Sequence, residues 1–213
     1  GIAESKIWCG GFLLKPDFYN PPLNDNEKED FIQNKLGMDP HKINLILSTG
    51  ANSANNHMQF LNAYKNQSLR PGIVALCGFN KSTHRMISSW EKQFANWQII
   101  PMKYYDKMST LLQCASAIVA RPGTGTTSEA IISACPLIFN ALGGVMPQEN
   151  ITLKYCQKHG FGKIINSAKQ LPVISKEWTN DPRAIEKEKE IMRALQPQQH
   201  PLDFLKKLRS LVA

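Results

Sequence analysis

The chain has 213 residues, a hydrophobic content of 42% and a formal net charge of +8. This length fits one large domain, or one domain with a lead-in and a tail, and the apolar content excludes global disorder. The positive charge favours an anionic partner, such as a nucleotide, a nucleic acid or an acidic membrane face, about as much as it fits a solvated basic surface.

Five cysteines occur in the chain, and they are odd in number and far apart. They are Cys9, Cys77, Cys114, Cys135 and Cys156. Since their spacing is not that of a zinc site, we interpret them as reduced core residues of a cytoplasmic protein. No stretch approaches the roughly 20 apolar residues of a membrane span, and no secretory signal is visible.

In chain order, residues 1–41 are predicted to be a lead-in that ends in a short surface helix stopping at Gly37. From residue 42 onward, β-rich apolar runs alternate with segments of helical spacing. The predicted strands are 42–48, 72–78, 98–102, 117–121, 136–140 and 162–165. The predicted helices are 57–67, 82–97, 106–115, 126–134 and 150–159, followed by terminal helices within 175–195 and 200–213.

The predicted strands are continuous apolar runs, so both faces of their sheet should be covered by helices. Together with the alternation of strand and helix, this predicts an α/β domain over residues 42–213 with a doubly wound parallel sheet. Ligands of such sheets lie beyond the carboxyl ends of the strands. Three polar loops are expected at that edge: 48–56, 121–129 and 140–150.

The stretch "RPGTGTTSE" at 121–129 suits a phosphate group. Glycines allow close backbone approach, and the amino terminus of a helix presents free N–H groups and a positive dipole end. The spacing is neither that of a P-loop nor that of a dinucleotide fingerprint, and a plain strand-to-helix turn would look similar.

Three acidic or amide positions at this edge, Glu129, Gln148 and Asn150, have alternative interpretations. Glu129 either completes a capping box with Thr126 or accepts two hydroxyl groups, such as a ribose diol. In the third loop, Gln148 is favoured as a ligand contact, whereas Asn150 is favoured as a helix cap. The helix at 82–97 is expected to be capped by Ser82 or Thr83, and the helix at 150–159 to end at Gly160.

The segment "ARPGTGTTSEAIISACPLIFNALGGVMPQENITLKYCQKHGFG" resembles the carboxy-terminal half of glycosyltransferase family 28, in particular monogalactosyldiacylglycerol synthase-like members. The likeness extends over most of the chain, from "CGGFLLKPDF" to "FGKII". It implies the two-domain GT-B fold, in which a carboxy-terminal Rossmann-like domain holds a UDP-sugar. The amino-terminal domain of that fold holds the acceptor lipid and the catalytic base.

The resemblance also implies roles for individual residues. Glu129 would bind the ribose hydroxyls, Gln148 and Glu149 would contact the donor sugar, backbone groups around Tyr105 would read the uracil, and Gly50 would shape the first glycine-rich loop. The diphosphate cradle would be formed by Gly123, Thr124, Gly125 and Thr126. Thr152 stands where the synthase-like pattern has Asn, which leaves the donor sugar open.

The implied activity is an inverting, metal-independent transfer of a hexose from a UDP-sugar to a lipid or other hydroxyl acceptor, as in glycolipid synthesis, with no cofactor. Because the base is expected in the absent amino-terminal domain, this chain alone should bind the donor without turning it over. We expect a cytoplasmic protein with optional peripheral membrane contact. The basic segment 204–212 would either touch that surface or dock onto protein.

Other functions stay open on the same scaffold. One is a nucleotide-sugar-binding subunit of a split glycosyltransferase. Another is a UDP-sugar hydrolase or epimerase, which needs acid–base residues in the cleft and has His57 and His84 as its nearest candidates. Nucleic acid is not an expected partner, because the aromatic residues are not interleaved with basic ones.

Overall fold

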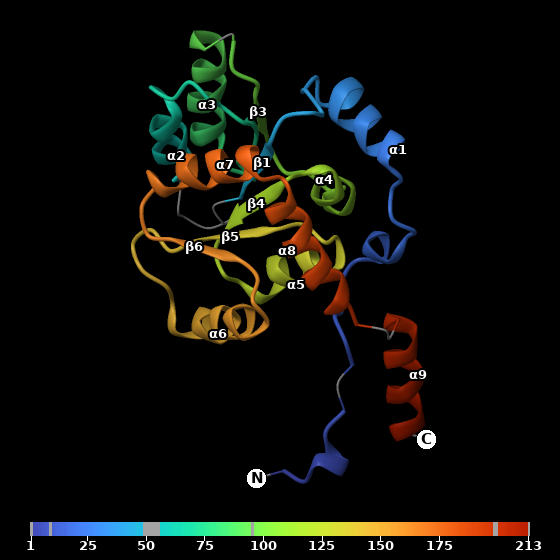
Figure 1. The fold of residues 1–213 in the computed structure, drawn as a ribbon. Coiled ribbons are helices and arrows are strands. Elements are labelled where there is room, and N and C mark those ends of the chain that lie inside the picture. Colours follow the sequence, from blue (N-terminus) through green and yellow to red (C-terminus); the bar gives the residue numbers. More distant parts are fainter. Residues whose placement is uncertain (1, 9, 49–55, 95, 198–199, 213) are drawn as a thin grey trace.

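A computed structural model describes residues 2–8, 10–48, 56–94, 96–197 and 200–212 (Figure 1). Within these ranges, six strands form one sheet in the order β3-β2-β1-β4-β5-β6, and every neighbouring pair is parallel. The strands are β1 (Asn44–Ser48), β2 (Gly72–Leu76), β3 (Ile99–Met102), β4 (Ala117–Ala120), β5 (Leu137–Asn140) and β6 (Lys163–Ile165). The predicted doubly wound parallel sheet is therefore confirmed.

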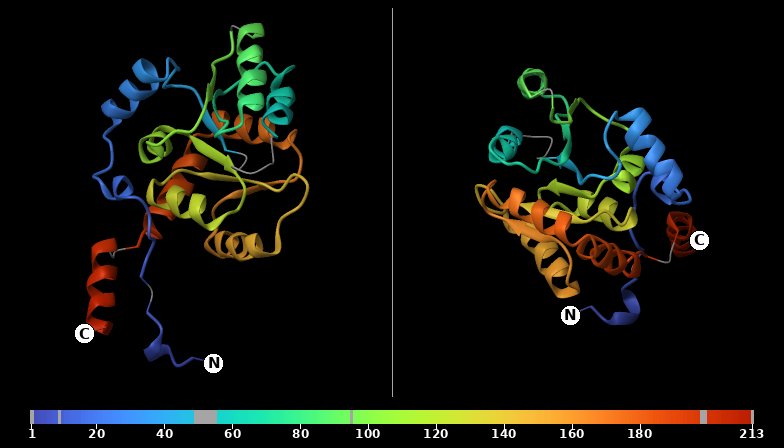
Figure 2. Two further views of the ribbon diagram at one scale, coloured as in Figure 1. Left: turned by 180° about the vertical axis from the view of Figure 1, so that it is seen from behind. Right: turned by 45° about the horizontal axis from the view of Figure 1, so that its top comes forward.

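Helices cover both faces of the sheet, as the continuous apolar strands predicted. One core contains side chains of α2 (His57–Tyr64), α3 (Lys81–Gln93) and α7 (Gln170–Asn180). The other contains side chains of α4 (Met108–Cys114), α5 (Thr124–Ile132), α6 (Asn150–His159) and α8 (Arg183–Ala194). Figure 2 shows the two helical layers from behind and from above.

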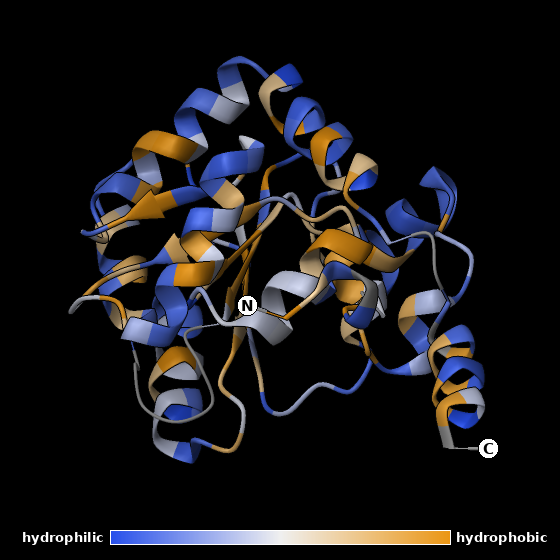
Figure 3. Cartoon of the chain, turned by 90° about the horizontal axis from the view of Figure 1, so that it is seen from below, coloured by the Kyte–Doolittle hydropathy of each residue, from blue (hydrophilic) through white to orange (hydrophobic). Residues whose placement is uncertain are grey.

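The middle strands of the sheet are buried because alternate side chains of each strand enter opposite cores, whereas the edge strands β3 and β6 are partly exposed. Ile46 pairs with Ile118 and points into the core of α5, whereas Leu45 and Leu47 point into the core of α2. The apolar strands lie inside the helices in Figure 3, and the outer helix faces are largely polar. The four strands in the middle of the sheet, β2, β1, β4 and β5, thus consist almost entirely of apolar residues.

The direction of winding reverses at β1. This strand pairs with β2 on one side and with β4 on the other, so the chain runs outward in both directions from this point. Parallel α/β sheets bind their ligands beyond the carboxyl ends of the strands at such a point of reversal, which here is the edge where β1 and β4 end. The loop after β4 lies in the described ranges, whereas residues 49–55 after β1, including Gly50, lie outside them.

Several helix ends differ from the sequence-based expectation. α5 begins at Thr124, two residues early, and α7 begins at Gln170. α3 is capped by Asn80, whose Oδ1 accepts the Thr83 N–H at 2.9 Å, so the expected Ser82 or Thr83 cap is wrong. Asn is as good a cap as Ser or Thr, so residue type alone does not choose between them. The end of α6 at Gly160, with φ of 76°, is confirmed.

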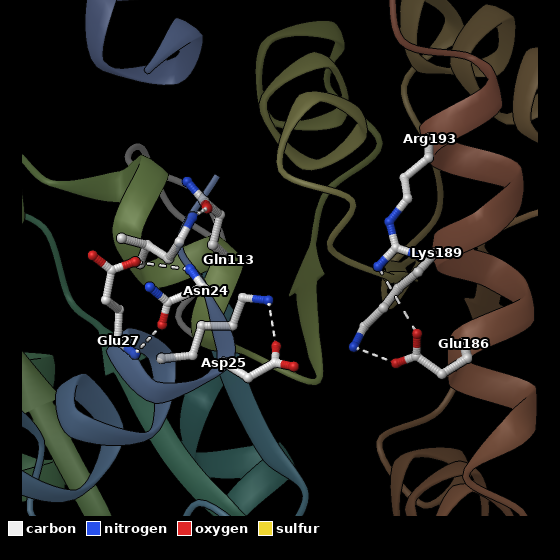
Figure 4. A network of polar contacts seen from close by, with 9 residues as sticks. Asn24, Asp25, Glu27, Gln113, Glu186, Lys189 and Arg193 are labelled. Carbon is white, nitrogen blue, oxygen red and sulfur yellow. Dashed lines mark hydrogen bonds and ion pairs between the residues drawn. The ribbon is translucent and has the colours of Figure 1, made fainter. Parts of the chain in front are cut away.

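The lead-in is more than a linker, because part of it packs into the core of α5. Phe18, Ile32 and Met38 are all buried there. Its helix α1 (Asp25–Asp30) starts with a capping box between Asn24 and Glu27 and continues into a π-helical turn, Phe31–Lys35. The Leu23 N–H donates to Gln113 Oε1 at 2.8 Å, which fastens the lead-in to α4 (Figure 4).

The last helix, α9 (Pro201–Val212), stands apart from the sheet beside the amino-terminal segment (Figures 1 and 2). The Trp8 ring stacks on Phe204 with 5.3 Å between centroids. The leucines of α9 are exposed: Leu202, Leu205, Leu208 and Leu211. None of the described helices combines the length and the apolar character that crossing a bilayer requires.

The cysteines support the expectation of reduced thiols as far as the structure describes them. Cys77, Cys114, Cys135 and Cys156 are free and buried, and Cys9 lies outside the described residues. Burial raises the pKa of the Cys77 thiol to about 11 and that of Cys135 to about 12. These thiols therefore stay protonated at neutral pH and act as small apolar core groups.

The buried position of Phe18 makes a stability prediction. Phe18→Ala should lower the free energy of unfolding by about 3 kcal/mol, because it removes an aromatic ring and leaves a cavity. Leu13→Ala, which changes an apolar lead-in side chain that is 60% exposed, should change it by less than about 0.5 kcal/mol. Chemical denaturation of both variants checks this, and equal small effects would show that the lead-in is detached from the core.

Candidate functional site at the carboxyl edge of the sheet

The amino terminus of α5 lies directly beyond the carboxyl end of β4 (Figure 1). Its N-cap is Gly123, and no side chain caps it, whereas α1 and α3 are capped by Asn24 and Asn80. The backbone N–H groups of the first helical turn therefore lack a side-chain acceptor. They coincide with the positive end of the helix dipole, an arrangement that favours a bound anion.

The two glycines at this turn leave its surface open. A Cβ atom added at Gly123 or at Gly125 would meet no other heavy atom within 4 Å. Neither residue has the positive φ that demands glycine. Packing and backbone conformation therefore do not explain these glycines, whereas close approach of a ligand to the helix backbone would.

Glu129 lies one turn further along α5, and of its two alternative interpretations the capping box with Thr126 is wrong. Thr126 is the third residue of the helix, so its neighbour three residues on is already in the helix interior. The Glu129 side chain is half-buried, and its carboxylate makes no hydrogen bond or ion pair with any described residue. Burial raises its pKa, opposed by the charge of Lys15 and assisted by that of Asp17.

A bidentate ion pair joins the loop after β4 to the loop after β5. Arg121 Nη2 lies 2.5 Å from Glu149 Oε2, and Nε donates to Oε1 at 3.2 Å. The Arg121 Nη1 donates to the Gly144 carbonyl oxygen at 2.7 Å. Glu149 is only 5% exposed, and its Oε2 also accepts the Met146 N–H at 2.8 Å. A bidentate contact of this kind fixes both the orientation of the two side chains and the distance between the two loops that carry them.

This arrangement changes how the third loop is read. α6 is preceded by a short 3-10 turn, Pro147–Glu149, and neither Gln148 nor Asn150 caps it, since Glu149 occupies the N-cap position. The Gln148 side chain is exposed, and its Nε2 donates only a weak hydrogen bond, to Met146 Sδ at 3.3 Å. Both Glu149 oxygens are engaged within the protein. The sugar contacts of Gln148 and Glu149 stay predictions, and the geometry favours Gln148.

The loops after β2 and β3 add aromatic rings to the same edge. Phe79 and Tyr104 stack face to face, with centroids 5.4 Å apart and planes 8° apart, and both rings are mainly exposed. Lys15 of the lead-in donates from Nζ to the Tyr104 hydroxyl at 3.4 Å. Tyr105 is half-buried and packs against the core of α5, so the uracil-reading role rests on its backbone and is still a prediction.

His57, one of the two histidines considered for a hydrolase or epimerase, is buried between the strands. His57 is 2% exposed, and its Nε2 lies within 3.2 Å of the carbonyl oxygens of Leu47 and Leu76. Two carbonyl acceptors require a proton on that nitrogen, and burial lowers the pKa of the ring. His57 thus links β1 to β2 as a neutral structural group. This geometry gives no support to acid–base catalysis by His57.

Three features of this edge escaped the sequence analysis. The Arg121–Glu149 pair spans 28 residues, and only the unusual position of Arg121, directly after a buried strand, hinted at it. Phe79 and Tyr104 follow neighbouring strands, so their stacking follows from strand order, which the sequence did not reveal. Lys15 reaches the site only because the lead-in folds back over α5.

Known proteins resemble this chain in sequence and in fold. Residues 45–150 match the model of the glycosyltransferase family 28 C-terminal domain, and this part of the chain belongs to that family. The chain is 28% identical over 169 residues to a processive diacylglycerol β-glucosyltransferase of Staphylococcus saprophyticus. It is 26% identical over 205 residues to a probable chloroplastic monogalactosyldiacylglycerol synthase of Glycine max.

The matches cover most of this chain but only part of each relative. They cover 78% and 92% of this chain, and 41% and 36% of the two relatives, so the chain spans less than half of their length. Among solved structures, Phytolacca americana UGT2, complexed with UDP-2-fluoroglucose and pterostilbene, superposes with a TM-score of 0.61. That match has 14% identity and covers 85% of this chain and 44% of that protein, which shows the carboxy-terminal GT-B fold.

The ion pair predicts a specific loss of stability. Glu149→Gln should lower the free energy of unfolding by about 3 kcal/mol, because it leaves the largely buried Arg121 guanidinium without its counter-charge. Glu190→Gln, at an exposed position of α8, is the matched control and should have almost no effect. Urea denaturation measures both, and an unchanged midpoint for Glu149→Gln would show that the pair does not hold the loops.

The raised pKa of Glu129 predicts a pH-dependent effect. A carboxyl group whose pKa is raised on folding costs stability as pH rises from its usual value of 4.5 through the raised value, because only the unfolded state ionises freely there. Glu129→Gln should therefore raise the thermal midpoint at pH 7.5 and leave it nearly unchanged at pH 4. Exposed Glu91→Gln is the control. A lower midpoint at pH 7.5 would contradict the assignment.

Proposed function

We propose that this chain is the donor-binding half of an inverting UDP-sugar glycosyltransferase that transfers a hexose to a lipid hydroxyl. The observation that carries the proposal is the uncapped, glycine-headed amino terminus of α5 at the point where the sheet winding reverses. The names of the relatives, a diacylglycerol glucosyltransferase and a monogalactosyldiacylglycerol synthase, support a glycolipid product. A lipid acceptor would bring the enzyme to a membrane surface, where the net charge of +8 is favourable.

In this proposal the diphosphate lies on the first turn of α5. The backbone N–H groups of Thr124, Gly125 and Thr126 would donate to its oxygens, and Gly123 would let it come close. Glu129 lies one turn away on the same helix, with a carboxylate that no described residue uses. Such a carboxylate can accept both hydroxyl groups of the ribose.

The remaining parts of the donor would extend to either side of α5. The uracil base of the donor would lie toward β3, near the backbone of Tyr105 and the exposed rings of Tyr104 and Phe79. The sugar would lie toward α6, where Gln148 is exposed and the Arg121–Glu149 pair fixes the loop behind it. Gly50, which follows β1 in the sequence, would border the same edge of the sheet. Thr152 is nearly buried, so it leaves the identity of the sugar to other contacts.

The reaction would break the bond between the anomeric carbon and the diphosphate oxygen. An acceptor hydroxyl oxygen forms the new bond from the opposite face, and its proton passes to a general base. The general base would lie in the part of the relatives that this chain does not span, so this chain would bind the donor without turnover. Negative charge grows on the leaving UDP, and fixed N–H groups at a helix terminus stabilise it. No metal ion or cofactor has a role in the proposal.

The glycine at position 125 allows a test in which stability and binding move in opposite directions. Gly125→Ala adds a methyl group in open space within a helix, so it should raise the free energy of unfolding by about 0.5–1 kcal/mol. If a diphosphate lies on this turn, the methyl group collides with it. UDP affinity, measured by calorimetry, should then fall at least about tenfold, a loss of about 1.4 kcal/mol, while uridine affinity changes little.

A matched control separates stability from the site. Asn62→Ala, at an exposed position of α2, also improves helix propensity but lies away from the α5 turn, so UDP affinity should stay at the wild-type value. UDP binding by Gly125→Ala at wild-type strength would place the diphosphate elsewhere. Equal losses for UDP and uridine would show that the turn does not face the phosphates.

A further inference from the structure

A cavity lies at the edge of the sheet opposite the candidate site, where the strands begin. Its volume is about 790 Å³, within the usual range for small-molecule sites. It is lined by residues that precede β1, β2 and β3, and by the end of α7 and the start of α8. The full length of the strands separates it from the amino terminus of α5, so a nucleotide at that turn would not enter it.

The lining of this cavity is positively charged. Its charged side chains are Lys42 and Arg70, and none of the described lining residues is Asp or Glu. Lys42 does have an acidic neighbour, Asp39, at 3.5 Å, but this pair is exposed and Asp39 is not part of the described lining. Exposed pairs of this kind contribute little and leave the ammonium group available to a second anion.

The guanidinium of Arg70 is fixed by two hydrogen bonds and still has N–H donors that no described residue uses. Its Nε and Nη2 donate to the carbonyl oxygens of Gln67 at 3.2 Å and Lys65 at 2.7 Å. Its guanidinium carbon lies 5.4 Å from the centroid of the Trp97 ring. A guanidinium has five N–H donors, so these two bonds leave others for a ligand. Fixed in this way, Arg70 loses little side-chain entropy on binding an anion.

Trp178 provides an independent sign of a missing partner. It lines the cavity and is 1% exposed, yet its indole Nε1–H has no acceptor among the described residues. Buried polar groups in native structures nearly always have a hydrogen-bond partner. The rest of the lining is largely apolar and includes Ile43, Leu69 and Pro182. A ligand with an acceptor oxygen and an apolar body would satisfy both parts of this surface.

We propose that this cavity is a second binding site, separate from the site at the carboxyl edge of the sheet, for a phosphate monoester with an apolar body. The phosphate would lie between Lys42 and Arg70, and one acceptor oxygen of the ligand would take the indole N–H of Trp178. The apolar body would cover Leu69 and Pro182. This site does not depend on the function proposed for the carboxyl edge, because it shares no residue with that edge.

The proposal is tested with hexyl phosphate and phenyl phosphate as probes of an alkyl and an aromatic body, and with inorganic phosphate as the anion alone. Calorimetry should show that at least one monoester binds about tenfold more tightly than inorganic phosphate, since burying two methylene groups contributes about this much. In ¹⁵N-correlated spectra, the Trp178 indole signal, assigned by its loss in Trp178→Phe, should shift on addition of the monoester.

Charge variants decide whether the anion lies where we propose. Lys42→Gln and Arg70→Gln should each weaken the monoester about tenfold, the usual loss for a hydrogen bond to a charged group. Lys92→Gln and Arg85→Gln, exposed on α3, are the matched controls and should have no effect. Arg70→Gln also removes packing, so Lys42→Gln is the decisive variant if Arg70→Gln fails to fold.

Three results would each overturn the proposal. The first is monoester binding that Lys42→Gln leaves unchanged, and the second is a Trp178 indole signal that does not move. The third is competition between the monoester and UDP in the wild-type protein, which would place the anion at the carboxyl edge. A failure of UDP to bind at all would count against the proposed glycosyltransferase function and leave the monoester result intact, so the two proposals fail independently.

Discussion

The ion pair between Arg121 and Glu149 is the contact on which the candidate site depends. Arg121 leaves the sheet directly after β4, and Glu149 stands just before α6, so one bidentate contact sets the spacing of the two loops that border α5. The glycine-headed turn alone would be a short, exposed segment with little to fix its direction. Because Arg121 lies two residues before the N-cap Gly123, the ion pair would limit movement of this turn, and electrostatic stabilisation of a leaving group requires fixed donors.

The same edge shows a division of labour between backbone and side chains. Charge on a diphosphate would be met by backbone N–H groups of α5, whereas Arg121, the cation next to them, is already neutralised by Glu149. Backbone donors are held by the helix and need no reorganisation when charge develops, unlike a long cationic side chain. In the proposed function, the carboxylate of Glu129 and the exposed amide of Gln148 would then be left for neutral hydroxyl groups.

Much of this architecture could be predicted from local patterns. Apolar runs such as 117–121 marked the buried parallel strands, and Gly160 marked a helix end that needs a left-handed residue. The start of α5 was placed two residues late, because a glycine N-cap without a side-chain bond gives no local signal. The Arg121–Glu149 pair and the structural role of His57 depend on strand order, which residue spacing does not encode. Gly50 lies outside the described residues, so its role is still a prediction.

The fold of the lead-in has a consequence for where a minimal domain can be cut. A boundary at residue 41 follows the change in sequence pattern, yet it would strip Phe18 and Ile32 from the core beneath α5. It would also remove Lys15 and Asp17, whose opposed charges act on the Glu129 carboxyl group. In an excised sheet domain, the pKa of the Glu129 carboxyl group would therefore differ from its pKa in the longer chain. Ligand affinities measured on such a fragment would describe an altered protein.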